Sequence, residues 1–163
     1  MSSESTSDYY ERLYGELRAL AARRVSAGMS LSPTELVNEV YLKLQGHEWA
    51  STTHFRATSV RAMRQVLVDR ARSRGREKRG GGQVPVTLVT GSGESEQPVD
   101  LMAVDQGLKA LAQERSRAAQ VAELRLFGGL TAQEIAEELQ VSERTVKSDW
   151  RLARAFLQVA LES

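Results

Sequence analysis

"LTAQEIAEELQVSERTVKSDWRLARAFL", residues 130–157, contains two helix starts that are separated by a short turn. Thr131 can cap the first helix, because Glu134 stands at the position that completes a capping box. Ser142 can cap the second helix. Two caps at this spacing favour a helix-turn-helix over an ordinary helical hairpin with a polar outer face.

The second helix of this motif is the element that would read DNA. Val146 and Trp150 are expected to face inward. Gln140 occupies a turn position where glycine is commoner, so its backbone must adopt an energetically less favourable conformation. The helix would enter the major groove at its N-terminal end. The side chains that it would present to bases and phosphates are Glu143, Arg144, Thr145, Lys147, Ser148 and Arg151.

The rest of the chain also shows the helical period of apolar residues. Helices are expected at residues 8–28, 33–46, 54–78, 101–113 and 115–127, before those of the motif at residues 131–139 and 142–161. Residues 81–100 are rich in glycine, serine and acidic residues, which predicts a flexible linker whose VPVTLV run is extended rather than paired. We therefore predict an all-α protein with two small helical domains, residues 1–80 and 101–163, joined by this acidic linker.

Composition argues against several classes of protein. The chain has no cysteine, which excludes disulfides and thiolate metal sites. Its only histidines, His47 and His54, have no clustered carboxylates beside them in the sequence, and no serine stands in a nucleophile elbow. We therefore expect no metal site, no cofactor and no enzymatic activity. No apolar run approaches the ~20 residues that span a bilayer, and no secretion signal is evident, so we expect a cytoplasmic protein.

Charge is unevenly distributed along the chain. Residues 56–80 hold 9 basic and 2 acidic side chains, whereas residues 81–114 hold 1 basic and 5 acidic side chains. On a helical wheel, Arg61, Arg64 and Arg72 fall opposite the apolar stripe of their helix. Such a face suits contacts with a phosphate backbone. A solvated basic helix that binds nothing explains the charge equally well.

The loop before this basic helix, GHEWASTT at residues 46–53, contains one aromatic residue, Trp49, that looks exposed. An aromatic ring beside the small polar side chains of Thr52, Thr53 and His54 could hold an unstacked base. The favoured alternative for Trp49 is a hydrophobic plug in the core.

Taken together, these segments resemble the extracytoplasmic-function (ECF) sigma factors of bacterial RNA polymerase over nearly the whole chain. TELVNEVYLKL, residues 34–44, resembles the polymerase-binding helix, and HFRATSVRAMRQVLVDRARSRGREKR, residues 54–79, resembles the reader of the minus-ten promoter element. Residues 130–156 resemble the reader of the minus-thirty-five element. RAMRQVLVDRAR, KRGGG and DWRLARAFL resemble in particular a subgroup linked to serine/threonine protein kinases.

The resemblance implies a sigma factor without enzymatic activity, which directs core polymerase to promoters and initiates transcription. Its partners would be core polymerase, bound through the clamp helices and the flap, together with promoter DNA, a serine/threonine kinase and an anti-sigma factor. It would not bind membranes, and it would be monomeric when free. The polymerase-binding residues would be Glu35, Asn38 and Glu39. The minus-ten contacts would be Trp49, Thr52, Thr53, His54, Arg56, Arg61, Arg64 and Arg72.

The start of the polymerase-binding helix departs from the family. Most relatives carry acidic residues there, whereas here residues 31–34 are Leu-Ser-Pro-Thr and the first charge is Glu35. Ser32 is the expected helix cap, and Glu35 completes its capping box. The cap therefore does not require the Thr34 hydroxyl. A phosphothreonine carries about −1.5 to −2 charge at pH 7. We therefore expect phosphorylation at Thr34, with Ser32 as the second candidate; the alternative is a solvent-facing Thr34 with no regulatory role.

A different class of protein remains open at this point. A dimeric transcriptional regulator would use only the helix-turn-helix to bind DNA and the N-terminal part to dimerise. It would recognise two identical half-sites, whereas a sigma factor would need polymerase to bind DNA tightly.

Overall fold

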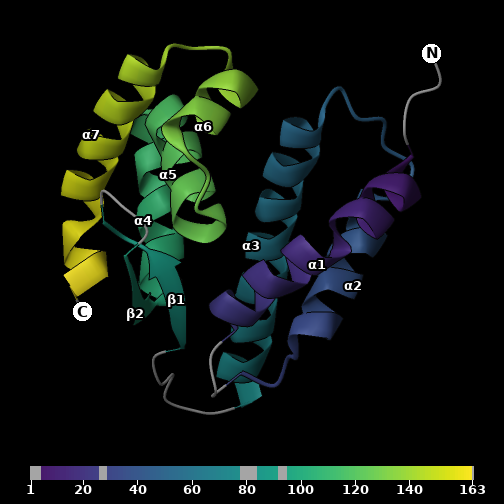
Figure 1. Cartoon of the computed structure of the whole chain (residues 1–163). Helices are drawn as coiled ribbons and strands as arrows, with labels where there is room; N and C mark the ends of the chain where they lie inside the picture. The colour runs from purple at the N-terminus through teal and green to yellow at the C-terminus, as the bar shows by residue number, and fades with distance from the viewer. Residues whose placement is uncertain (1–4, 26–28, 78–83, 92–94, 163) are drawn as a thin grey trace.

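The computed structural model describes residues 5–25, 29–77, 84–91 and 95–162. Helices dominate the structure (Figure 1), as the apolar periodicity predicted. In chain order the elements are α1 (Thr6–Arg24), α2 (Pro33–Leu44), α3 (Thr52–Glu77), β1 (Pro85–Val89), β2 (Glu96–Asp100), α4 (Leu101–Glu114), α5 (Ser116–Gly128), α6 (Ala132–Leu139) and α7 (Glu143–Glu162). The expected ends of two helices near residues 28 and 78, and the glycine triplet at residues 80–82, lie outside the described residues.

Much of the expected flexible linker is a β-hairpin. β1 and β2 pair antiparallel, with Val89 opposite Glu96. Val86 and Leu88 are both 0% exposed, so alternate side chains of the VPVTLV run enter the core. An isolated two-stranded hairpin is marginal in water, but here β1 packs on α5 and β2 packs on α7. The prediction of a flexible, unpaired linker is therefore wrong for the described part of residues 84–100, because other elements cover the apolar face of the hairpin.

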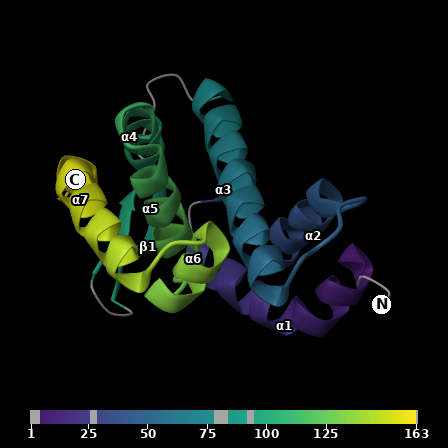
Figure 2. The ribbon, with the colours of Figure 1, turned by 90° about the horizontal axis from the view of Figure 1, so that it is seen from above.

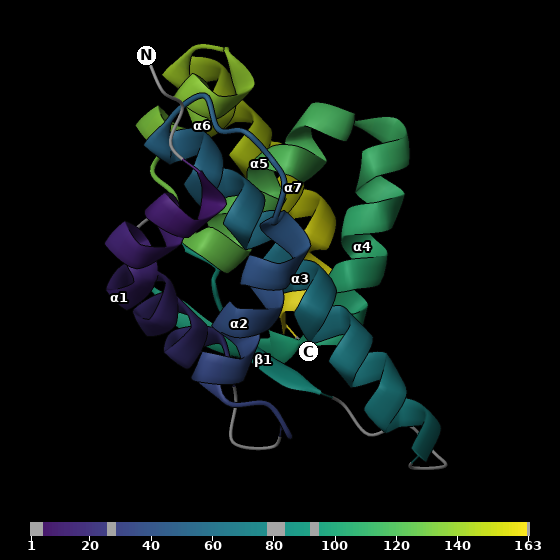
Figure 3. The ribbon, with the colours of Figure 1, turned by 90° about the vertical axis from the view of Figure 1, so that its right-hand side faces the viewer.

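α3 is shared by the two halves of the protein. It lies between α1 and α2 on one side and α4, α5 and α6 on the other (Figure 2). Seen from the N-terminal half, α1 and α2 lie over α3 (Figure 3). Tyr9 of α1 stacks on Phe55 of α3, with 4.9 Å between the ring centroids. Buried apolar side chains from Tyr9 to Leu161 form one continuous core. The division into domains at residues 1–80 and 101–163 stays a prediction.

Two helix crossings depend on the small size of glycine. A Cβ atom on Gly107 of α4 would lie 2.6 Å from Leu157 Cδ2 of α7. A Cβ atom on Gly128 of α5 would lie 2.6 Å from Val60 Cγ2 of α3. Both distances are far inside van der Waals contact, so a larger side chain must push its neighbour away. Gly128 therefore sets how closely the C-terminal half approaches α3.

The helix-turn-helix predicted from residues 130–157 is confirmed as α6, a turn and α7. Thr131 and Glu134 form a reciprocal capping box, with side-chain to backbone distances of 3.1 and 3.0 Å. Ser142 Oγ accepts from the Thr145 N–H at 3.1 Å and caps α7. Gln140 has φ 57° and ψ 48°, the left-handed conformation that its turn position demands. The local signals of this segment therefore determine its structure.

Replacement of Gln140 by glycine is expected to raise the free energy of unfolding by about 0.5–1 kcal/mol. Glycine removes the steric cost of the left-handed conformation, and this gain exceeds the extra backbone entropy that glycine loses on folding. Chemical denaturation monitored by circular dichroism measures the change. The matched control is Gln133→Gly, an exposed position inside α6, which should lower the stability by about 1 kcal/mol. A loss of stability in both variants would show that Gln140 carries no strain.

Candidate nucleic-acid interface

The N-terminal half of α7 presents an exposed polar face. The predicted DNA contacts that are exposed on it are Glu143, Arg144, Lys147, Ser148 and Arg151. None of them forms an ion pair within the part of the chain that the structure describes. Val146, on the inner side, is 2% exposed and holds the helix against the body of the protein. An outer face of unpaired polar and basic side chains is suited to bases and phosphates.

Thr145 differs from the other residues predicted for this face. It is half-buried, and its Oγ1 accepts a hydrogen bond from Ser142 Oγ at 2.9 Å. The side chain therefore belongs to the helix cap. On the same turn, Asp149 pairs with Arg117 of α5 at 2.6 Å, which fixes the orientation of α7.

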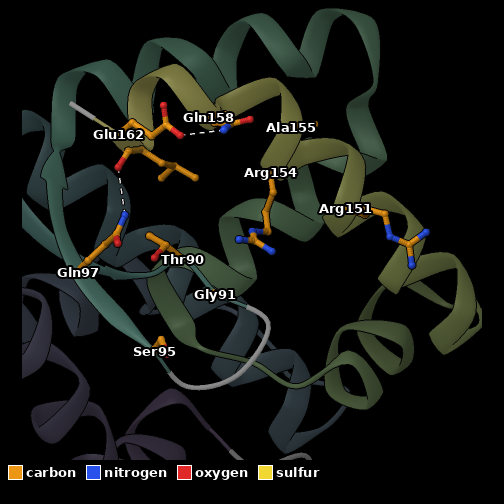
Figure 4. A pocket seen from close by; sticks show the side chains of 10 residues that line it. Thr90, Gly91, Ser95, Gln97, Arg151, Arg154, Ala155, Gln158 and Glu162 are labelled. Carbon is orange, nitrogen blue, oxygen red and sulfur yellow. Dashed lines mark hydrogen bonds between the residues drawn. The ribbon is translucent and has the colours of Figure 1, made fainter.

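Arg154, which sequence reasoning did not single out, extends the basic character of α7. A pocket of about 560 Å³ lies between α7 and the hairpin, and both Arg151 and Arg154 border it. Figure 4 shows the Arg154 guanidinium pointing into this pocket, whereas Arg151 points away from its centre. Arg154 Cζ also lies 6.0 Å from the ring centroid of Trp150. The signal in the sequence was its spacing of one helical turn from Trp150.

The cationic face of α3 is covered by the C-terminal half. Arg64 contacts Glu123 of α5 at 2.7 Å and Asp105 of α4 at 2.8 Å. Arg61 pairs with Glu138 of α6 at 3.3 Å. Burial of Arg64 disfavours its charge, but hydrogen bonds and the charges of Glu123 and Asp105 outweigh that cost and raise the pKa of the guanidinium. The arginines expected to face phosphates therefore face carboxylates of the same chain.

The remaining basic side chains of the predicted minus-ten site meet the same elements. The contacts are His54 Nδ1 with Glu138 at 3.0 Å, Arg72 with Asp105 at 3.4 Å and Arg56 with Glu134 at 3.9 Å. Arg56 also pairs with Glu16 of α1 at 2.7 Å. These described α3 side chains stay partly exposed, with 38% of His54, 31% of Arg56 and 41% of Arg72 accessible, but tertiary packing brings acidic side chains against them.

Trp49 is buried in the N-terminal half, with 6% of its surface exposed. Its Nε1 donates to Thr6 Oγ1 at 3.0 Å, and its ring meets Phe55 edge-on at 5.1 Å. The expectation that Trp49 is exposed is wrong, because its loop folds over α1 and α3, as the hydrophobic-plug alternative requires. Thr52 and Thr53 are half-buried at the start of α3.

Comparison with known families agrees with this arrangement of parts. A model of the ECF sigma factor family matches residues 2–163, nearly the whole chain. The protein belongs to the ECF sigma factor family. No curated protein matches the chain. ECF sigma factors are transcription initiation factors rather than enzymes, and their partners are RNA polymerase and promoter DNA.

The candidate polymerase-binding helix of this sigma factor begins as predicted. Ser32 Oγ accepts from the Glu35 N–H at 3.1 Å and caps α2. The capping box is only half formed, because the Glu35 carboxylate makes no return bond to the Ser32 N–H among the described contacts. Thr34 is half-buried, and its Oγ1 accepts from Arg18 Nε of α1 at 3.2 Å. The Thr34 hydroxyl therefore lies beside the guanidinium of Arg18.

The other predicted polymerase contacts lie on the first turns of α2. Glu35 is exposed and has no ion-pair partner among the described residues. Asn38 accepts from the Tyr10 hydroxyl at 2.7 Å. Glu39 is paired with Arg70 of α3. This surface of the sigma factor therefore has one unpaired carboxylate and one that a guanidinium already neutralises.

Arg24 is the residue that sequence reasoning missed. It is 0% exposed at the junction of α1, the hairpin and α5. Its Nε donates to the Phe127 carbonyl at 2.7 Å, and its Nη1 contacts the Thr87 carbonyl at 3.2 Å and Glu96 Oε1 at 2.9 Å. Burial lowers the pKa of Arg24, and the hydrogen bond and charge of Glu96 offset part of that effect. No pattern in the sequence around residue 24 predicts this role.

Two structural features are absent from the described part of the sigma factor. No group of three or more histidine, cysteine, aspartate or glutamate side chains there has the arrangement of a metal site. No helix there combines the length and the apolar character needed to cross a bilayer.

Proposed function

We propose that this sigma factor directs core polymerase to specific promoters by reading the minus-thirty-five element with α7 and the minus-ten element with α3. The exposed, unpaired face at the start of α7 is the observation that carries the proposal. Residues 1–80 and 101–163 would be the two functional domains. A dimeric regulator is not favoured, because the family match extends over residues 2–163 rather than over the helix-turn-helix alone.

An exposed apolar stripe supports a second polymerase contact beside the clamp-binding helix α2. Leu152, Phe156 and Val159 are spaced by helical turns on the outer side of α7 and are 37%, 41% and 84% exposed. Apolar side chains that gather on one exposed face mark an interaction surface. We assign this stripe to the polymerase flap.

Control by phosphorylation of Thr34 is the regulatory part of the proposal. The neighbouring guanidiniums of Arg18 and Arg70 offset the carboxylates of Glu35 and Glu39, so the unmodified surface has a formal charge near zero. A phosphate would add about −1.5 to −2 charge. It would also stand in the first turn of α2, where the helix dipole favours an anion. A serine/threonine kinase would be the activating partner.

The proposed function requires polymerase. Mixed with core polymerase and genomic DNA of its host, the protein should produce transcripts with a defined set of 5′ ends, whereas the protein alone should bind promoter fragments weakly. Sequencing of transcript ends and electrophoretic mobility shifts measure both. A tight complex between a dimer of the protein alone and a palindromic site would contradict the proposal.

Alanine at Arg144, Lys147 or Arg151 should weaken promoter recognition in different ways. Loss of a bidentate base contact should cost about 1–3 kcal/mol and relax the preference at one base pair, whereas loss of a phosphate contact should weaken all sequences alike. Run-off transcription from promoters with single base changes separates the two. The control is Arg115→Ala, at an exposed arginine between α4 and α5. Full promoter activity of all three variants would exclude α7 as the reader.

A further inference from the structure

We propose that the free sigma factor inhibits itself: Asp105, Glu123 and Glu138 hold the basic face of α3 closed, and they must leave before α3 can contact DNA. This proposal rests on the assignment of α3 as the minus-ten reader. It goes beyond that assignment because it gives the carboxylates of the C-terminal half the role of an intramolecular competitor of promoter DNA.

The contacts between the halves use the same groups that DNA would need. Arg64 is shared by Asp105 at 2.8 Å and Glu123 at 2.7 Å, and Arg61 is held by Glu138 at 3.3 Å. The carboxylate side chains are the more buried partners, with 4%, 14% and 9% of their surface exposed. A carboxylate and a phosphate oxygen accept the same hydrogen bonds from a guanidinium. DNA would therefore compete with these three side chains for the same guanidinium donors.

Apolar packing at the end of α5 also holds the C-terminal half against α3. Val60 of α3 lies against the end of α5, where Gly128 leaves no room for a Cβ atom. Leu130 closes the same contact, because its Cδ1 would also lie 2.6 Å from that Cβ. The closed arrangement thus combines screened ionic contacts with a steric fit that salt does not affect.

Self-inhibition would affect the two DNA-reading faces differently. The outer face of α7 is exposed in the closed arrangement. In contrast, the basic side chains of the minus-ten site pair with carboxylates of the C-terminal half, which lies beside α3 (Figure 2). If only a fraction of molecules is open, the apparent affinity of α3 for single-stranded DNA falls by that fraction. The closed state would thus block DNA binding by α3 but not by α7.

The first experiment measures the distance between the halves. The chain has no cysteine, so spin labels can be attached at Glu48→Cys and Gln133→Cys, which are exposed on opposite halves. Double electron–electron resonance should show one short distance at low salt. The double variant Glu123→Gln with Glu138→Gln should add a population with a longer distance between the labels. Gly128→Ala should add the same population without any change of charge. An unchanged distance in both variants would overturn the proposal.

The matched control for the charge change is Glu114→Gln with Glu137→Gln. These carboxylates are exposed on α4 and α6 and make no ion pair among the described residues. The control removes the same number of charges, so it should leave the short distance intact.

The second experiment titrates each variant with a fluorescein-labelled single-stranded DNA of mixed sequence. Glu123→Gln with Glu138→Gln should bind about fivefold more tightly or better, within the usual range of coupling between two sites, whereas the control pair should bind like the wild type. Equal binding by the two pairs would overturn self-inhibition. Arg61→Ala with Arg64→Ala tests the minus-ten assignment separately: if this variant opens but still binds the DNA tightly, the assignment of α3 fails.

Discussion

Arg24→Met should lower the free energy of unfolding by about 3 kcal/mol. Methionine keeps much of the buried volume but removes every hydrogen bond of the guanidinium, so the carbonyls of Phe127 and Thr87 lose their donor. A buried acceptor without a partner costs about 1–3 kcal/mol. Glu96 also loses its counter-charge, and that part of the loss is moderated because its side chain is 23% exposed. Urea denaturation of the full chain measures the change.

The control for this prediction is Arg23→Met, which removes the same charge from the next position. Arg23 is exposed, so its replacement should change the stability by no more than about 0.5 kcal/mol. A double variant, Arg24→Met with Glu96→Gln, should be less destabilised than the sum of the single changes, because the two side chains interact directly. Equal stability of the Arg24→Met and Arg23→Met proteins would refute the role assigned to Arg24.

Thr34→Ala is expected to leave the protein folded but inactive in cells. Among the described residues the Thr34 side chain bonds only to Arg18, at 3.2 Å. Ser32 with Pro33 already defines the start of α2. The change therefore removes the proposed phosphate acceptor with little effect on stability. Phosphorylation of the wild type should raise its affinity for core polymerase about tenfold or more, equivalent to ~1.4 kcal/mol. The gain should shrink with salt, since exposed charges are screened over about 10 Å at 0.1 M.

Three variants separate this mechanism from a simple effect on the helix. Ser32→Ala should lower the stability by about 1 kcal/mol through loss of the cap, whereas Thr34→Ala should not. Thr34→Asp, with one charge and a different shape, should restore activity partly or not at all. Arg18→Ala should bind core polymerase somewhat better than the unmodified wild type, because it removes a positive charge beside α2. A fully active Thr34→Ala protein, or equal affinities with and without the phosphate, would make Thr34 a mere helix-start residue.

The sequence alone was sufficient for the helices and for the turn of the DNA-reading motif. The signals at Thr131, Ser142 and Gln140 involve groups a few residues apart, so the chain around each of them determines the result wherever the segment packs. The same holds for the cap at Ser32. Family membership likewise followed from the order of such segments.

Only the tertiary structure decided what the charged and apolar groups between these signals contact. Arg64 meets Asp105 and Glu123 across 41 and 59 positions of the chain, and Arg24 meets Phe127 across 103. A helical wheel placed the α3 arginines opposite the apolar stripe of their own helix, but it contained no information on which helix would cover them. The β-hairpin was missed for a related reason: its two strands are stable because α5 and α7 cover their apolar side. Local propensity describes groups within one or two turns of each other, whereas burial and ion pairing depend on which distant surfaces pack together.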